Sequence, residues 1–473
     1  MSTVTMPERE IPVIGDYDVV VAGGGPGGIP AAVAAARAGA KTLLIERYGY
    51  LGGMATAGLI TVILGTRASG TDEPMIGGIA EELCREMASI GGAPEYAEAV
   101  RRGGIAFDPE AFKLVSDALV LGSNVDLRLH SWVVDALVED GMISGLVLES
   151  KSGRQAVTGK VFVDATGDAD VVWQAGASFT HGREFDGAVQ SMGSMFRFGG
   201  VDEERLPKGE DASAIMDRAR EAVNSGEVKA YNPSWGGMVA GKIAGEHMAN
   251  ATRFPGDPCS VEDLTEGEIQ LRRDTWELID WWRENVPGLE DCYLIATPPH
   301  IGLRESRQMV GLECVTGQDV VDARTRDDAV ARCPYWIDIH CPLGRAKNST
   351  HLCYKKCPND PPCSMYEERY EELPGNADDE HREGLHPKDG LWFDIPWGSL
   401  VSADIPNLLS AGRIISCDHQ AMSALRVMAT CMAIGEAAGE GAAMAADSVL
   451  DGDATAVDVA ALQERLRANG AAC

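Results

Sequence analysis

The sequence predicts an α/β fold, with a parallel sheet extended by a β-meander in one domain and a mixed α+β arrangement in a second domain. Three observations predict it. An apolar strand near the N-terminus leads through a glycine-rich turn into a helix of small residues, residues 125–163 hold several short strand-like runs, and residues 395–445 end in a long Ala/Gly-rich helix. Strands that alternate with helices are typical of parallel sheets covered on both faces.

We expect at least two lobes, because a chain of 473 residues is too long for one simple core. The second lobe interrupts the first in the sequence. The expected parts are a tail at 1–15, the first domain at 16–176, a substrate or cap domain at 177–394 with a cysteine-rich insertion at 333–383, a return to the first domain at 395–447, and a C-terminal helix or tail at 448–473.

Composition narrows the class of protein. Hydrophobic residues make up 45% of the chain and charged residues 24%, as in ordinary soluble globular proteins. The net charge of −31 argues against nucleic acid and anionic membranes as partners, since like charges repel. We find neither a signal-peptide pattern nor a run of about 18 apolar residues, so we expect a cytoplasmic location with no membrane partner. The twelve cysteines should then be mostly reduced thiols.

Residues 18–46 predict a Rossmann-like strand, turn, helix and strand in one unbroken run. Val19–Ala22 is an apolar stretch expected in a buried strand. Gly23, Gly25 and Gly28 follow at G-x-G-x-x-G spacing, where the first permits a tight turn, the second lets a pyrophosphate approach the backbone, and the third lets the helix pack on the strand. A diphosphate would lie at the helix N-terminus, where N–H groups and the dipole favour an anion.

The second strand of this unit is Thr42–Ile45, and Glu46 closes it near the ~20-residue spacing expected of a ribose-binding acid. Residues 47–65, RYGYLGGMATAGLITVILG, are too rich in glycine and small residues for a regular element. Such a segment lets backbone pass close to a ligand, and the alternative is a plain surface loop. We therefore expect a dinucleotide site rather than an unrelated glycine turn.

Residues 107–175 predict a helix and a meander. Asp108–Leu121 carries an N-cap Asp and a proline in its first turn. Strand-like runs then follow at 125–129, 132–139, 144–148 and 161–163, and the last of them enters the segment VDATGDADV. Asp164 and Asp168 could form an acid–base pair, but acids at a strand end and a helix start are more often caps, and we favour the structural interpretation.

The second domain offers two features. Thr265–Asn285 predicts a helix with Thr265 as its cap, and its Trp276, Trp281 and Trp282 are expected to pack in a core rather than to bind substrate. Arg304 and Arg307 are expected one turn apart on a short helix start, where they form either an anion site for substrate or a domain-interface salt bridge.

The cysteine-rich insertion contains His340, beside Cys341, and then Cys353, Cys357 and Cys363. Its spacing matches neither zinc C-x2-C pairs nor a ferredoxin run, so we predict no metal site, while these four cysteines stay weak candidates. An unliganded lid, a zinc or iron–sulfur site, and redox thiols are the alternatives. An imidazole such as that of His340 can act as general acid or base near neutral pH, and a structural role is equally open.

The C-terminal stretch predicts a strand at Asn407–Ser410, a glycine turn and the long helix. Its small residues allow close packing on the first domain: Gly435, Ala438, Gly439, Ala442 and Ala443. A membrane-spanning helix is excluded by Arg426, Glu436 and Glu440.

These motifs together resemble the FAD-dependent oxidoreductases with a fold like that of glutathione reductase and p-hydroxybenzoate hydroxylase. The shared features are the opening glycines, the GGMAT loop, the ATG turn and the segment NLLSAGRIIS followed by CMAIGEAAGEGAA. The resemblance implies non-covalent FAD held by Gly23, Gly25, Pro26, Gly27, Gly28, Glu46, Arg47, Gly53, Met54, Ala55, Thr56, Val134, Ala165, Thr166, Gly167, Gly412, Arg413, Ala429, Thr430 and Cys431. The flavoprotein subunit of heterodisulfide reductase is a distant relative, but its cluster-binding motif has no match here.

The expected activity is hydride transfer between a small organic substrate and flavin N5. We take His340, Arg304, His419 and Arg426 as candidate catalytic residues, with Cys431 more plausibly a packed thiol than a redox group. The alternatives are an electron-transfer flavoprotein with a metal or iron–sulfur site in the insertion, a non-catalytic flavin-binding sensor or assembly protein, and a flavin monooxygenase. The electron donor or acceptor is unknown, and a homo-oligomer is an open expectation.

Overall fold

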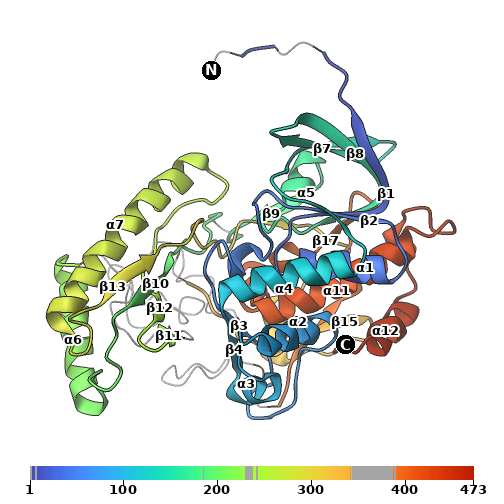
Figure 1. The fold of residues 1–473 in the computed structure, drawn as a ribbon. Coiled ribbons are helices and arrows are strands. Elements are labelled where there is room, and N and C mark those ends of the chain that lie inside the picture. The colour runs from blue at the N-terminus through green and yellow to red at the C-terminus, as the bar shows by residue number, and fades with distance from the viewer. Residues whose placement is uncertain are drawn as a thin grey trace.

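The structure is a computed structural model. It describes residues 3–5, 8–184, 186–228, 238–240, 243–340, 342, 387 and 390–473. Two sheets dominate these residues, each with helices packed on it, and they lie on opposite sides of Figure 1.

The larger sheet has five parallel strands and a meander. Its order is β5 (Asp126–Arg128), β2 (Thr42–Ile45), β1 (Val13–Ala22), β8 (Gly153–Asp164), β7 (Met142–Ser150) and β6 (Trp132–Glu139), while β17 (Leu408–Ser410) pairs with the end of β8. β7 is antiparallel to both β6 and β8, and the other pairs are parallel. The predicted α/β fold with a parallel sheet and a β-meander is confirmed.

Helices cover both faces of this sheet. Figure 1 shows α1 (Gly28–Arg37), α4 (Pro109–Gly122) and α11 (Met428–Ala445) layered on one face, with α2 (Gly78–Ser89) and α12 (Val459–Ala468) further out. α5 (Asp170–Gln174) packs with the meander on the other face, where Val171 and Val172 are fully buried. Asp108 caps α4 as predicted, accepting a hydrogen bond from the Glu110 N–H at 2.8 Å.

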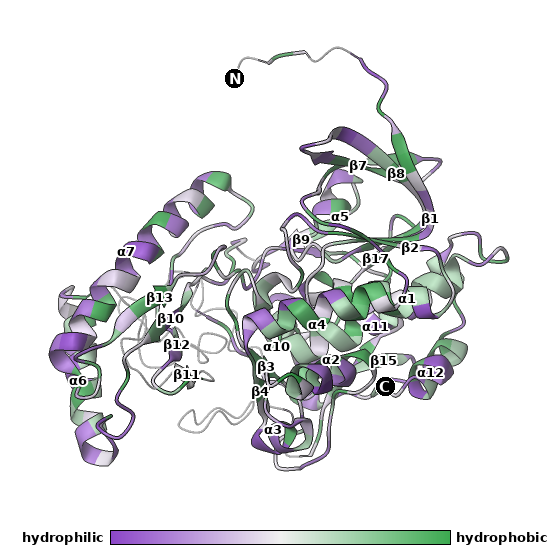
Figure 2. Cartoon of the chain, viewed as in Figure 1, coloured by the Kyte–Doolittle hydropathy of each residue, from purple (hydrophilic) through white to green (hydrophobic). Residues whose placement is uncertain are grey.

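The smaller sheet is antiparallel, in the order β11 (Met238–Ala240), β12 (His247–Asn250), β10 (Met195–Gly199) and β13 (Tyr293–Ala296). α6 (Gly209–Ser225) and α7 (Val261–Asn285) lie along its outer side (Figure 1). Figure 2 shows polar and apolar residues alternating around α7, as expected for a helix with one buried face. On that face Trp282 contacts the rings of Phe196 and Phe198, at centroid distances of 5.8 and 5.1 Å.

Shorter elements complete the chain. They are η1 (Gly53–Ala55), β3 (Val62–Leu64), α3 (Tyr96–Arg102), β4 (Gly104–Ala106), β9 (Phe179–His181), β14 (Arg307–Met309), α8 (Gly317–Asp322), β15 (Ala329–Cys333), β16 (Phe393–Pro396), η5 (Trp397–Ser399), η6 (Gly412–Ile414), α10 (His419–Leu425) and η7 (Ala454–Ala456). β9 pairs with β14, β15 with β16, and β3 with β4.

Three local predictions were wrong. α7 begins at Val261, because the Ser260 side chain accepts a hydrogen bond from the Asp263 N–H, whereas the predicted cap Thr265 lies inside the helix and bonds the Val261 carbonyl. Trp276 does not pack in the core, since it is 52% exposed. The third concerns Arg304 and Arg307, which do not lie on a helix.

The segment around Arg304 and Arg307 is extended. Arg307 opens the strand β14, and β14 pairs with β9. An extended backbone directs these two side chains to different surroundings instead of one helical face. Arg304 and Arg307 therefore do not form the shared site that the sequence predicts.

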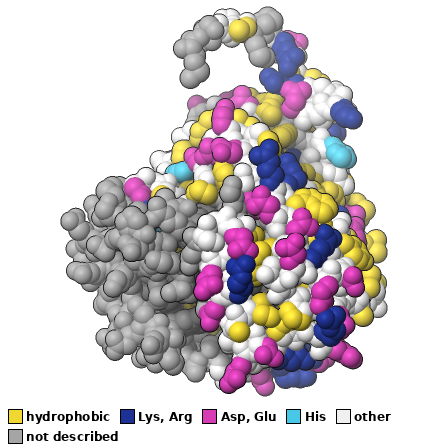
Figure 3. Space-filling model, turned by 90° about the vertical axis from the view of Figure 1, so that its left-hand side faces the viewer, with side chains coloured by type: hydrophobic (Ala, Val, Ile, Leu, Met, Phe, Trp, Pro, Cys, Tyr) yellow, Lys and Arg dark blue, Asp and Glu magenta, His cyan; other side chains and the backbone are white. Residues whose placement is uncertain are grey.

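Charged side chains on the surface are mixed in sign. On the face drawn in Figure 3, Lys and Arg are interspersed with Asp and Glu over the described residues. No single helix among the described residues has the length and apolar composition needed to cross a membrane, although α10 and α11, bent by 94° at their junction, meet those criteria as a pair.

The helices α1 and α11 pack with their backbones in direct contact. A Cβ atom on Gly435 would lie 2.0 Å from the Gly27 carbonyl oxygen, and one on Gly439 would lie 2.0 Å from that of Ala31. Only glycine permits this backbone contact, because any side chain would force the helices apart. The small residues at these two α11 positions therefore serve the packing that the sequence predicts.

Substituting Gly435→Ala should destabilise the protein by about 1–3 kcal/mol, since the new methyl group overpacks a rigid contact. The matched control is Gly122→Ala at the end of α4, where a Cβ meets no atom within 4 Å. Chemical denaturation of both variants measures the difference. Equal stability of the two variants would contradict the packing role.

Glu436 places a carboxylate inside this helical layer. It is 2% exposed, and its Oε2 accepts a hydrogen bond from the Ile79 N–H at 3.0 Å, in the first turn of α2. Burial raises the pKa of Glu436 to about 7. The native state therefore holds this proton at pH values where the unfolded chain has released it.

Because the folded pKa exceeds the unfolded value near 4.5, stability should fall as pH rises from about 4.5 to 7 and stay lower above that range. Glu436→Gln removes this cost and should stabilise the protein by roughly 1–3 kcal/mol at pH 8, with little effect at pH 5. Denaturant titrations at the two pH values test it. If Glu436→Gln changes the free energy of unfolding by the same amount at pH 8 as at pH 5, the raised pKa of Glu436 is refuted.

Candidate active site

A deep cavity lies where the large domain meets the smaller sheet. It spans about 1610 Å³ of space, a figure that includes its open mouth. Its walls come from segments far apart in sequence: Gly23–Gly27, 46–48, 53–64, 165–168, 193–195, 302–304, 335–340, 411–413 and 426–431 all contribute residues. Residues from both ends of the chain and from the smaller sheet therefore border one cavity.

One half of the cavity is a cradle of bare backbone. A Cβ on Gly25 would meet only the Cα of Gly53, at 3.7 Å, and Gly53 has a φ of +49°. Behind them Gly27 packs on Gly412, whose N–H would lie 2.9 Å from a Cβ at Gly27. Glycine is required where a pyrophosphate approaches the chain, and the α1 N-terminus points its N–H groups at this place.

The acid after β2 is tied into the same turn. Glu46 Oε2 accepts a hydrogen bond from the Gly24 N–H at 2.7 Å, and Oε1 accepts one from the Tyr48 N–H at 2.8 Å. Burial raises the pKa of Glu46, and these two donors oppose that effect. A side recess next to it is lined by Gly23, Ile45, Glu46, Arg47, Ser131, Trp132, Val133, Thr166 and Asp170. Val133, and not the predicted Val134, faces this recess.

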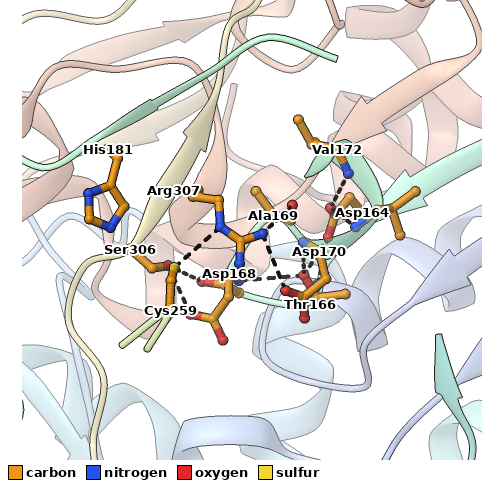
Figure 4. A network of polar contacts seen from close by, with 12 residues as sticks. Asp164, Thr166, Asp168, Ala169, Asp170, Val172, His181, Cys259, Ser306 and Arg307 are labelled. Atoms are coloured by element: carbon orange, nitrogen blue, oxygen red, sulfur yellow. Dashed lines mark hydrogen bonds and ion pairs between the residues drawn. The ribbon is translucent and has the colours of Figure 1, made fainter. Parts of the chain in front are cut away.

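Asp164 has the structural role that the sequence favoured. It is fully buried and accepts hydrogen bonds from the N–H groups of Thr166, Val171 and Val172 at 2.8–3.0 Å, so it fixes the turn into α5 (Figure 4). Thr166 adds its hydroxyl, which donates to Asp164 Oδ1 at 2.7 Å. The turn that borders the cavity is thus held by one carboxylate.

Asp168 differs from Asp164, because it is part of the cavity wall. Its Oδ1 accepts hydrogen bonds from Arg413 Nη2 and the Ser306 hydroxyl, both at 2.8 Å. Burial acts to raise the pKa of Asp168, but the guanidinium groups of Arg413 and Arg47 outweigh it and leave the pKa lowered. Its ionised carboxylate therefore positions Arg413 at the cradle.

The other half of the cavity is more apolar, with a polar end. Ile60, Val62, Leu64, Met195, Leu303, Tyr335, Val427 and Met428 form its walls. At its end lie Asn250, Arg304, Asp338, His340 and Arg426. Asp338 Oδ2 lies 3.2 Å from Arg426 Nη2 and 3.5 Å from His340 Nε2. Burial, followed by the charge of Arg304, lowers the pKa of His340 well below its usual value, so the ring is neutral at pH 7.

Most of the predicted site residues line the cavity. These are Gly23, Gly25, Pro26, Gly27, Glu46, Arg47, Gly53, Met54, Ala165, Thr166, Gly167, Arg304, His340, Gly412, Arg413, Arg426 and Cys431. Gly28, Ala55, Thr56, Ala429 and Thr430 are buried behind its wall. Gly28 has the packing role of the third glycine, since a Cβ there would lie 1.7 Å from the Gly23 carbonyl oxygen.

His419 does not line the cavity. It is buried, and its Nδ1 lies 2.7 Å from Glu305 Oε1. Glu305 Oε2 also accepts a hydrogen bond from the Gln190 N–H at 2.8 Å. A role in holding this part of the wall fits His419 better than direct contact with substrate.

Arg307 also lies away from the cavity. Its Nε donates to Cys259 Sγ at 3.2 Å, and its Nη1 contacts the Ala169 carbonyl and Asp170, at 3.3 and 3.5 Å (Figure 4). Of the two expected anion-binding arginines, only Arg304 reaches the cavity. The interface role suits Arg307.

Sequence reasoning missed Asn250 and Asp338 as wall residues and Ser306 as a donor to Asp168, and each comes from a loop end or a strand end with no motif of its own. The weak metal candidates Cys341, Cys353, Cys357 and Cys363 lie outside the described residues. Among the described residues, the ligand atoms of His181, Asp257 and Cys259 lie within 4.8 Å of one another. The guanidinium of Arg307 beside that thiol disfavours a cation there.

The glycine cradle, the acid after β2 and the helix N-terminus define a dinucleotide-binding protein of the Rossmann type. The chain belongs to the FAD-dependent oxidoreductase family, because the model for "FAD dependent oxidoreductase" matches residues 18–466. FAD fits this site, and the buried Nε of Arg413, which has no hydrogen-bond partner among the described residues, faces the same cradle.

Individual relatives match over parts of their length. Digeranylgeranylglycerophospholipid reductase 2 of Methanopyrus kandleri is 30% identical over 154 residues, which cover 32% of this chain and 38% of the reductase. Thiamine thiazole synthase of Methanococcus vannielii is 28% identical over 174 residues, 33% of this chain and 59% of the synthase. The chain thus matches less than two thirds of either relative.

A solved structure covers most of the chain. A geranylgeranyl bacteriochlorophyll reductase-like protein from Thermoplasma acidophilum aligns with 97% of this chain and 84% of its own, at 15% identity and a TM-score of 0.46. The family membership rests on the sequence model and not on this likeness.

Arg413→Gln should weaken FAD binding about 10- to 100-fold, because a hydrogen bond from a charged donor contributes roughly 1.5–3 kcal/mol. Titrating FAD into flavin-free protein and following flavin fluorescence measures the affinity. The control is Arg324→Gln, whose side chain is 59% exposed and bonds Asp319 away from the cavity. Unchanged affinity in the Arg413 variant would remove this residue from the FAD site.

Proposed function

We propose that this FAD-dependent oxidoreductase transfers a hydride between a small organic substrate and flavin N5. The observation that carries the proposal is the second half of the cavity, which continues from the glycine cradle past the start of α11 to an enclosed polar end. A cradle alone would serve a protein that only binds FAD. A walled space beyond it, with a histidine and two arginines, provides for a reacting molecule.

The cofactor would be held by the glycine cradle, Arg413 and the first residues of α11, and when bound it would supply the hydride acceptor or donor. α11 begins at Met428, after Val427, and both residues line the cavity. The positive end of this helix favours negative charge at the adjoining position. The apolar walls exclude water from the reacting region.

His340 is the residue best placed to hold the proton that accompanies hydride transfer. Its Nδ1 lies 3.4 Å from Arg253 Nη2, a donor, and its Nε2 lies 3.5 Å from Asp338 Oδ2, an acceptor. This pattern assigns the proton of the neutral ring to Nε2, on the side of Asp338, and makes Nδ1 the acceptor facing Arg253. Arg426, which donates to the Asp338 carbonyl at 2.9 Å and contacts its carboxylate, positions that acceptor.

Three alternatives are separated from this proposal by different measurements. An electron-transfer flavoprotein with a metal or cluster in the cysteine-rich insertion would contain stoichiometric zinc or iron. A sensor or assembly protein would bind FAD but show no turnover. The proposal does not name the electron donor or acceptor. Oxygen-dependent use of a nicotinamide donor would instead favour a monooxygenase.

Purified protein should carry the absorbance of oxidised flavin, and a member of a panel of small metabolites should bleach or restore it without oxygen. His340→Asn should slow that step about 100-fold or more, since general acid–base catalysis typically contributes that much. Stopped-flow absorbance follows the reaction. His130→Asn, at an exposed turn residue with a φ of +53°, is the control. A flavin that no panel compound reduces or oxidises would contradict the proposed reaction.

A further inference from the structure

We propose that Gln190 is a positioning residue for His340, and that a buried contact between Glu305 and His419 holds Gln190 in place. The inference rests on the proposed function, since His340 is the residue that would hold the proton there. Gln190, Glu305 and His419 are absent from the residues that line the cavity, so they would act through His340 and not on the substrate. No motif of the sequence includes Gln190.

His340 ends a segment whose residues alternate between the core and the cavity. Ile337 and Ile339 are fully buried in the core of the large domain, whereas Asp338 and His340 line the cavity. This period of two is the one that an extended chain gives. The two side chains on the cavity side therefore depend on how the main chain of this short segment is held.

Two side-chain oxygens hold that main chain. The Asp338 N–H donates to Ser423 Oγ, and the His340 N–H donates to Gln190 Oε1, both at 3.0 Å. Both bonds are shorter than the contacts of 3.4 and 3.5 Å that the His340 ring makes with Arg253 and Asp338. The position of the main chain, and with it that of the ring, depends on these two acceptors.

Gln190 is fully buried, and its amide group uses only part of its hydrogen-bonding capacity. The oxygen accepts the bond from His340, whereas Nε2 has no hydrogen-bond partner among the described residues. A buried donor without a partner costs about 1–3 kcal/mol, so an apolar side chain of the same size would suit a purely structural position better. The amide is explained by the acceptor that it gives to His340.

Glu305 and His419 hold Gln190 in place. Glu305 is fully buried, its Oε2 accepts a hydrogen bond from the Gln190 N–H at 2.8 Å, and its Oε1 lies 2.7 Å from His419 Nδ1. This contact assigns a proton to Nδ1, because a carboxylate oxygen is an acceptor. His419 is the first residue of α10, and Ser423 lies one turn later in the same helix. α10 therefore anchors the cavity segment twice, through Ser423 directly and through His419, Glu305 and Gln190.

Gln190→Met keeps the size of the side chain, removes the acceptor and leaves the main-chain bond to Glu305. Nitrogen NMR of holoprotein with isotope-labelled histidine reports the tautomer of each ring, and His340→Asn identifies the His340 signals. At pH 7 the unmodified ring should carry its proton on Nε2. Gln190→Met should raise the Nδ1–H form to at least a tenth of the population, because the ring is no longer held in one position. The control is Gln308→Met, since Gln308 is 1% exposed and its Nε2 also has no partner among the described residues.

The outcomes separate this inference from the proposed function. If the His340 signals are the same in Gln190→Met as in the unmodified protein, or change equally in Gln308→Met, the positioning role is overturned. Should Gln190→Met fail to fold, Gln190→Asn, whose amide oxygen falls one methylene short, replaces it with the same expected result. The NMR measurement needs no turnover. If no panel compound reacts with the flavin, the proposed reaction fails, while a His340 ring that depends on Gln190 still supports the inference.

Discussion

The backbone contact between α1 and α11 underlies the rest of the structure. Gly435 and Gly439 let α11 lie directly against the carbonyl groups of Gly27 and Ala31, and Gly412 meets Gly27 from the adjoining turn. This contact joins segments from opposite ends of the sequence into one surface. The cofactor cradle is that surface, because its backbone atoms come from the glycine turn on one side and from the start of α11 on the other. Helices kept apart by side chains would leave no continuous cradle.

The arginines that line the cavity contrast with the net negative charge of the whole chain. The protein carries a net charge of −31, yet arginines project from several directions into the cavity that holds its chemistry. Each is fixed differently: Arg413 by the buried Asp168, Arg426 by Asp338, and Arg304 by carbonyl and amide oxygens. A net negative surface would discriminate against adventitious anions that approach the cavity.

The elements that follow from local chemistry could be predicted from the sequence. The strand pair β1 and β2, the cap of α4, the meander and the glycine-rich α11 each depend on residues close to one another in the chain. The wrong predictions have different causes. Arg304 and Arg307 have the spacing of neighbours on one helical face, but the pairing of β14 with β9 makes their segment extended. Thr265 is a residue type that often caps helices, but Ser260, more than one helical turn earlier, is the actual cap.

The position of β17 has a consequence for how the protein is made. This strand completes the sheet by pairing with the end of β8, although the whole of the smaller domain separates the two in sequence. On the ribosome, β8 therefore emerges with an open edge and waits while the intervening segment is synthesised. Only when β17 and α11 arrive can the flavin pocket close. Nascent chains would thus depend on the intervening domain folding early, or on chaperones, to keep that edge from pairing with a neighbour.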